Sequence, residues 1–263
     1  MKPEKIFETK SIEEKEQSQE KEYKRLDDKE AERIIDEKID IKTLVDKLEI
    51  EFQKPLAVVE ALARLVLELK DELPNYDTIL SDEVSGRIPS LLLGNILEKV
   101  REREGKKEPN TYFISAGRHA DPRIESYVDK FIKKKKNKFG KTLLVTEFID
   151  TGNSIEKITN ILTEQDTEQD VDFNIASVSI SEKLREATKK TNLSKESIKK
   201  LRVGKEESYI GLEFYAKEFI GVEKTASSNN AYPVANIFRN QEKVNKVRKD
   251  METVADELYK LTE

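Results

Sequence analysis

The chain has 263 residues, of which 38% are charged and 36% hydrophobic, and its formal net charge at pH 7 is −5. No apolar run approaches the roughly 20 residues that a helix needs to cross a bilayer, so we expect no membrane span. Cysteine is absent and His119 is the single histidine, which excludes disulfides and thiolate zinc sites and argues against a multi-histidine metal centre.

The first residues, MKPEKIFETKSIEEKEQ, lack the apolar segment of a signal peptide and carry too many glutamates for a transit peptide, so we expect a cytoplasmic protein. Residues 8–38 are dense in Glu and Lys with few apolar positions, which predicts an exposed arm rather than part of the core. We therefore assign residues 1–54 to a charged, helical N-terminal arm.

A core domain is predicted to begin at Pro55. The segment PLAVVEALARLVLELKDEL carries apolar residues at intervals of three and four, which is typical of a helix with one wide apolar face. Strands and helices then alternate, with strands predicted at 76–82, 111–117, 141–149 and 171–180 and helices at 91–105, 121–136 and 153–165. Such βαβ units indicate an α/β fold, with a mostly parallel sheet and helices on both of its faces.

The predicted core domain spans residues 55–225. Residues 181–207 are polar and basic with two short helical pieces, and we expect them to form an excursion from the sheet. Residues 207–214 and 216–224 are candidates for a final pair of strands.

Residues 226–263 are predicted to form a loop followed by an amphipathic helix. Apolar residues from Val244 to Leu261 recur alternately at three and four, which defines one apolar seam. That seam could pack on the chain's own domain or against a second copy in a homodimer.

A basic run, KKKKNK, occupies residues 133–138. No aromatic residues are interleaved with the lysines to stack on bases, and the net charge of the chain is negative. We therefore interpret the run as a solvated helix end and expect no nucleic-acid site.

The most informative stretch is LLVTEFIDTGNSI, in which an apolar strand runs into a polar turn and then a helix. Its Asp-Thr-Gly suggests an aspartic protease, but that chemistry needs two such aspartates, and the chain contains one Asp-Thr-Gly. Helix capping by Asn153 or Ser154 is a second interpretation. Capping does not explain Asp150, nor Glu147, a carboxylate within a strand expected to be buried.

A phosphate-binding turn is the third interpretation, and it accounts for all of these residues. A short turn before a helix presents backbone N–H groups and hydroxyls at the positive end of the helix dipole, here from Thr151, Gly152, Asn153 and Ser154. Gly152 would let the backbone approach a ligand closely. Carboxylates at the end of the strand lie where ligands of open α/β sheets bind, which together suggests a sugar phosphate.

The stretch from Leu143 to Ser154 resembles the ribose-phosphate loop of type I phosphoribosyltransferases. That loop carries an apolar strand, two acidic residues, two mostly apolar residues, a further residue that is often acidic, and then Thr-Gly-any-Thr/Ser. Glu147 matches the second acid, Asp150 the later one, and Thr-Gly-Asn-Ser the turn, while Thr146 stands where the family carries its first acid. The resemblance implies that the acids hold the ribose hydroxyls of phosphoribosyl pyrophosphate and that the turn binds its 5′-phosphate.

The resemblance extends to two loops upstream. The family's first strand ends in a loop that binds pyrophosphate, and here Ser85, Gly86 and Arg87 follow the first predicted strand of the sheet. The second strand of the family commonly leads to a basic residue on the pyrophosphate, and the matching residue is Arg118.

The resemblance implies a Mg²⁺-dependent transfer of the phosphoribosyl group to or from a nitrogenous base. Glu147 would hold the ribose hydroxyls and Asp150 would assist proton transfer on the acceptor, whereas no direct protein ligand is assigned to Mg²⁺. Tyr232 and Phe238 are candidates to stack on the base. Because Thr146 removes one acid, the alternative is a regulatory or scaffold protein of the same fold that binds phosphoribosyl pyrophosphate or a nucleotide without catalysis.

Overall fold

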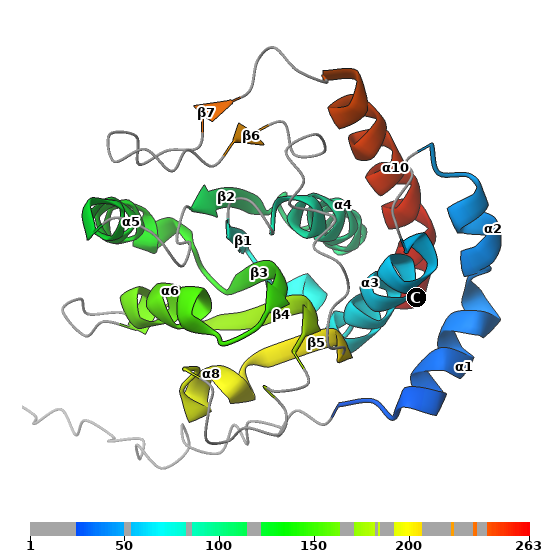
Figure 1. Ribbon diagram of the computed structural model, residues 1–263, viewed down its shortest axis with the longest axis horizontal. Coiled ribbons are helices and arrows are strands. Elements are labelled where there is room, and N and C mark those ends of the chain that lie inside the picture. Colours follow the sequence, from blue (N-terminus) through cyan, green and yellow to red (C-terminus); the bar gives the residue numbers. More distant parts are fainter. Residues whose placement is uncertain are drawn as a thin grey trace, which may run out of the picture.

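The computed structural model describes residues 25–49, 54–82, 86–114, 122–163, 171–181, 184, 192–206, 222–223, 234–235 and 241–263. A five-stranded sheet lies at its centre, with the strand order β2-β1-β3-β4-β5 (Figure 1). The strands are β1 (Thr78–Asp82), β2 (Asn110–Ile114), β3 (Thr142–Ile149), β4 (Phe173–Ile180) and β5 (Leu201–Glu206). Every neighbouring pair in this sheet is parallel, which confirms the predicted α/β class.

Helices cover both faces of the sheet, as predicted (Figure 1). One face carries α1 (Asp28–Lys38), α2 (Ile41–Asp46), α3 (Pro55–Leu69), α4 (Arg87–Arg103), α10 (Gln241–Tyr259) and the short η4 (Lys260–Thr262). The other face carries α5 (Pro122–Lys135) and α6 (Asn153–Thr163). The remaining short helices are η2 (Leu73–Asn75), η3 (Lys136–Lys138) and α8 (Lys195–Lys199).

The central strand β3 separates two apolar cores. Leu143 and Val145 pack in the core under α3, α4 and α10, whereas Leu144 packs in the core under α5 and α6. Successive side chains of a strand point to opposite faces, so a strand covered on both sides needs an almost continuous apolar sequence. This requirement explains the run Leu-Leu-Val in β3 and the burial of every residue of β4.

The N-terminal segment differs from its prediction as an exposed arm. Residues 28–38 form α1, and Ala31 and Ile35 on this helix, with Ile39 just after it, are buried in the same core as α3. These three residues are spaced by four and form a narrow apolar stripe, which the surrounding glutamates and lysines obscure in the sequence. Residues 1–24 of the predicted arm lie outside the described residues.

The predicted excursion at 181–207 is wrong for residues 201–206. Leu201–Glu206 form β5, which pairs with β4 and completes the sheet. The sequence LRVGKE reads as polar because of its charged residues, but Arg202 is only 6% exposed and its charge is paired within the chain. The strand was not predicted because its sequence includes a charged residue, Arg202, whose charge is paired in the folded protein.

The C-terminal helix α10 packs on the chain's own domain, one of the two predicted alternatives. Its seam residues from Val247 to Leu258 are buried in the core with α3 and α4, and Val244 is buried as well. Of the predicted final strand pair, the structure describes the two-residue strand β6 (Val222–Glu223), which pairs in antiparallel fashion with β7 (Val234–Ala235). Residues 207–221 lie outside the described part of the chain. No helix in the described part is both long and apolar enough to span a bilayer.

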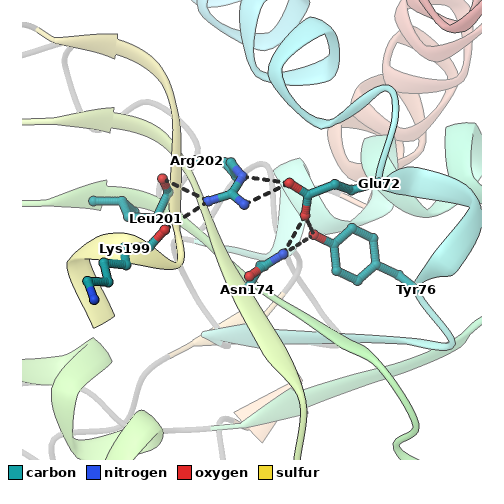
Figure 2. Close-up of polar contacts among 6 residues, drawn as sticks. All are labelled: Glu72, Tyr76, Asn174, Lys199, Leu201 and Arg202. Carbon is teal, nitrogen blue, oxygen red and sulfur yellow. Dashed lines mark hydrogen bonds and ion pairs between the residues drawn. The ribbon is translucent and has the colours of Figure 1, made fainter. Parts of the chain in front are cut away.

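A buried polar network ties the sheet together at the amino ends of its strands (Figure 2). The Arg202 guanidinium donates from Nε and Nη2 to Glu72 Oε1 over 3.0 and 2.7 Å. Glu72 Oε2 accepts from the Tyr76 hydroxyl at 2.7 Å and from the Asn174 amide. Burial, reinforced by the Glu72 charge, raises the pKa of the Tyr76 phenol well above its usual value, so this hydroxyl stays protonated and acts as a donor.

Candidate functional site

The sheet has one topological switch point, between β1 and β3. These strands are neighbours, with Thr78 opposite Thr142 and Ser81 opposite Val145, although β2 lies between them in the chain. The helix that follows β1 packs on one face of the sheet, and the helix that follows β3 packs on the other. In open α/β sheets, ligands bind in the crevice at the carboxyl ends of the strands at such a point.

The predicted strand, turn and helix around Asp150 are all present. Strand β3 ends at Ile149, the polar turn follows, and α6 begins at Asn153. Within β3, Thr146 is 1% and Glu147 is 5% exposed, whereas Asp150 is exposed just beyond the strand. The parallel sheet and the helix after the turn are incompatible with the all-β framework of an aspartic protease.

Gly152 is required in this turn for a reason that the sequence did not reveal. Its φ is 83°, a conformation that side chains disfavour, and an added Cβ would lie 2.5 Å from Leu193 Cγ. The space beside the glycine is thus taken by a residue of the same chain. The interpretation that Gly152 leaves room for a ligand is therefore replaced by one in which it leaves room for Leu193.

The amino end of α6 is held by the segment that precedes α8. The backbone carbonyl of Thr151 accepts from the Asn192 N–H at 2.9 Å. Glu156, in the first turn of α6, accepts from the Ser194 N–H and from the Ser197 hydroxyl, each at 3.1 Å. Because the first N–H groups of any helix lack intrahelical acceptors, this end carries a positive potential beside the turn.

The amino end of α4 is the second helix terminus at the switch point. Gly86 is its N-cap, with no side chain to accept from the helix, and the first turn contains no acidic residue. Arg87, the first residue of α4, places its guanidinium carbon 4.4 Å from the ring centroid of Phe113, which lies near the carboxyl end of β2. A cation beside the positive end of a helix dipole is unfavourable unless an anion compensates both.

Two of the predicted groups of site residues follow neighbouring strands of the sheet. Gly86 and Arg87 follow β1, and the stretch from Glu147 to Ser154 ends β3 and begins α6, on neighbouring strands of the sheet. Four other predicted site residues lie outside the described part of the chain, namely Ser85, Arg118, Tyr232 and Phe238.

Some residues of the site were not predicted from the sequence, because they approach it from a distant segment of the chain. Leu193 and Ser197 reach the turn from another part of the chain, and Ser194 is 38 residues from its partner Glu156. No local pattern signals such contacts. Glu156 itself was visible as an acidic residue in the first turn of a predicted helix.

Among the residues that the structure describes, no three His, Asp or Glu side chains are grouped so that they could hold a metal. Mg²⁺ usually binds through one or two carboxylates together with the phosphates of its substrate. Two carboxylates lie near the end of β3, Glu147 within the strand and Asp150 just beyond it.

The site so defined belongs to an α/β protein with a doubly wound parallel sheet and two helix amino termini at its switch point. No protein-family model matches the chain, and no curated protein is significantly similar to it.

Proposed function

We propose that this protein binds phosphoribosyl pyrophosphate, or a nucleotide 5′-phosphate, with Mg²⁺, and transfers the phosphoribosyl group to or from a nitrogenous base. The observation that carries the proposal is the position of two helix amino termini at the β1/β3 switch point, each directly after a strand end. Helix amino termini that follow neighbouring parallel strands each favour an anion, which supports a ligand with an anionic group at each end. The resemblance of the β3 turn to a ribose-phosphate loop supports a sugar between them.

The two termini differ in charge, which supports an assignment of the ligand's two ends. The α4 terminus has a glycine N-cap, no acid in its first turn, and Arg87. The α6 terminus carries Glu156. The more highly charged pyrophosphate would therefore bind at α4 and the singly phosphorylated end at α6.

Transfer would break the bond between the anomeric carbon and pyrophosphate, through a transition state with positive charge on the ribose. Bound Mg²⁺ would neutralise charge on the leaving pyrophosphate. Arg87 would stabilise the same charge through its guanidinium. Glu147 would hold the ribose hydroxyls and stabilise the cationic ring, and the exposed Asp150 would take or give the proton of the acceptor base.

The second candidate function is binding without catalysis, and Thr146 favours it. This residue is almost fully buried in β3 beside Glu147 and is neutral where the first acid of the resembled loop would stand. The site then has one negative charge fewer to stabilise a cationic ribose. A protein that senses phosphoribosyl pyrophosphate needs the two anion sites but not that charge.

Two assays test these functions in order. Calorimetric titration with phosphoribosyl pyrophosphate and Mg²⁺ tests binding, and absence of heat at millimolar ligand would exclude both candidates. Incubation with a panel of purines, pyrimidines and small amides then tests for release of pyrophosphate. Release identifies a transferase, whereas tight binding without release across the panel supports the sensor.

We predict that replacement of Arg87 by alanine weakens binding of phosphoribosyl pyrophosphate about ten- to a hundredfold, because a charge-assisted contact to an anion is lost. Arg103 provides a matched control, since it lies at the other end of α4 and also places its guanidinium over an aromatic ring, that of Tyr259. The Arg103→Ala variant should bind within about twofold of wild type. Equal losses in both variants would contradict the assignment of Arg87.

A further inference from the structure

The segment from Asn192 to Ser197 contacts both the candidate phosphate turn and the first turn of α6. Leu193, which is buried in the core under α5 and α6, lies against Gly152. The Asn192 N–H donates to the Thr151 carbonyl at 2.9 Å. Ser194 and Ser197 both donate to Glu156 on the first turn of α6.

Glu156 carries an acidic side chain in the first turn of α6, so its charge affects an anion at this turn. Side chains on a helix point back toward its amino end, so a carboxylate in the first turn can reach the N–H groups that a phosphate would use. It would also place a negative charge beside that phosphate. A site that binds an anion at this helix end therefore needs the Glu156 carboxylate to be kept elsewhere.

The Ser194 N–H and the Ser197 hydroxyl both donate to the Glu156 carboxylate and fix its position. Ser197 is 3% exposed, and its hydroxyl lies 3.1 Å from Glu156 Oε2, 2.9 Å from Ser194 Oγ and 3.4 Å from Thr159 Oγ1. Its N–H donates to Ser194 Oγ, the N-cap of α8, at 3.1 Å. Contacts with α8 and α6 thus fix the Ser197 hydroxyl in the position where it donates to the Glu156 carboxylate.

We propose that Ser197 and the Ser194 N–H hold the Glu156 carboxylate away from the turn, and so act as positioning groups that admit the phosphate end of the ligand. The inference rests on the proposed function, because it assigns the turn of residues 151–154 to that phosphate. It adds that docking of residues 192–197, which include the start of α8, controls the affinity of the turn for anions.

The test is titration of ribose 5-phosphate into the full-length protein and three variants. Ser197→Ala frees the carboxylate and should weaken binding about three- to tenfold, the size of a charge effect at a helix end. The double variant Ser197→Ala, Glu156→Gln should regain the affinity of wild type, because the released side chain is then neutral. A hydroxyl deletion at Thr253, on the exposed side of α10, is the control and should leave binding unchanged.

The possible results distinguish the positioning role of Ser197 from the proposed function. Wild-type binding that Ser197→Ala leaves unchanged would overturn the positioning role and leave the proposed function standing. Weakened binding without recovery in the double variant would also overturn it, since a loss of structure alone is not repaired by removing a charge. No binding by wild type of either ribose 5-phosphate or phosphoribosyl pyrophosphate would overturn the proposed function itself.

A fourth variant keeps the test usable if Ser197→Ala does not fold. With Ser197 intact, Glu156→Gln alone should change the affinity for ribose 5-phosphate less than about twofold, because the carboxylate is already held aside. A tenfold gain in this single variant would show that the charge acts on the turn in the native protein, and would contradict the proposal.

Discussion

Replacing Gly204 with alanine is expected to lower the free energy of unfolding by about 3 kcal/mol, which is the upper part of the usual range for overpacking a core. An added Cβ would lie 2.6 Å from the Val178 carbonyl oxygen and closer still to that of Ala61. Both are backbone atoms, in β4 and α3, so neither can move away as a flexible side chain would. Relief requires α3 to move off the edge strand β5, which exposes apolar surface in its core.

Gly94 offers a matched control for this substitution. It lies within α4, and an added Cβ would find its nearest neighbours at ordinary van der Waals distance, 3.8 Å to Ile79 Cδ1 and 4.0 Å to Thr111 Oγ1. Alanine there should stabilise the protein by about 0.5–1 kcal/mol, because glycine costs conformational entropy in a helix. Urea denaturation of both variants measures the difference, and a Gly204→Ala variant as stable as wild type would contradict the close approach of α3 to β5.

Replacing Glu147 with glutamine should reduce turnover by about 10²–10³-fold, if the protein is a transferase. The variant keeps the size of the side chain and removes its charge, which is needed as positive charge develops on the ribose. Glu147 is 5% exposed, so little water is present to screen that charge or to replace it. The assay is release of pyrophosphate from phosphoribosyl pyrophosphate in the presence of the acceptor base.

A second buried carboxylate controls for the effect of removing a charge from the interior. Glu68, on α3, is 7% exposed and accepts from the Leu26 N–H at 3.3 Å, in a part of the molecule that contributes no residue to the switch-point site. The Glu68→Gln variant should lose stability but retain turnover per folded molecule. Full turnover in Glu147→Gln would remove Glu147 from the mechanism, whereas equal loss in both variants would indicate a general effect on folding.

The fold could be predicted where the apolar pattern has one dominant period. Helix α3 has a wide apolar face, and β3 and β4 are mostly apolar segments bounded by polar ones, so their type and order follow from the sequence alone. The predictions failed where charge masked the pattern. The apolar stripe of α1 is one residue wide, and β5 carries an arginine whose partner Glu72 is 130 residues away.

The candidate site could be predicted as far as local sequence determines it. A strand, a turn with a left-handed glycine and a helix start are encoded within residues 143–155, so their arrangement was foreseeable. The reason for Gly152 was not, because Leu193 approaches from a segment that is distant in sequence. Long-range packing of this kind depends on the whole fold and leaves no local pattern.

Hydrogen–deuterium exchange in the presence and absence of phosphoribosyl pyrophosphate and Mg²⁺ tests the central claim most directly. Binding at the β1/β3 switch point predicts slower exchange in peptides that contain Gly86 to Ser90 and Asp150 to Lys157, because the backbone N–H groups of both helix termini would contact the ligand. Peptides around Tyr76, Asn174 and Arg202, at the opposite ends of the strands, should exchange at unchanged rates. Unchanged exchange at both helix termini, or slowing confined to the opposite edge of the sheet, would contradict a sugar-phosphate site at the switch point.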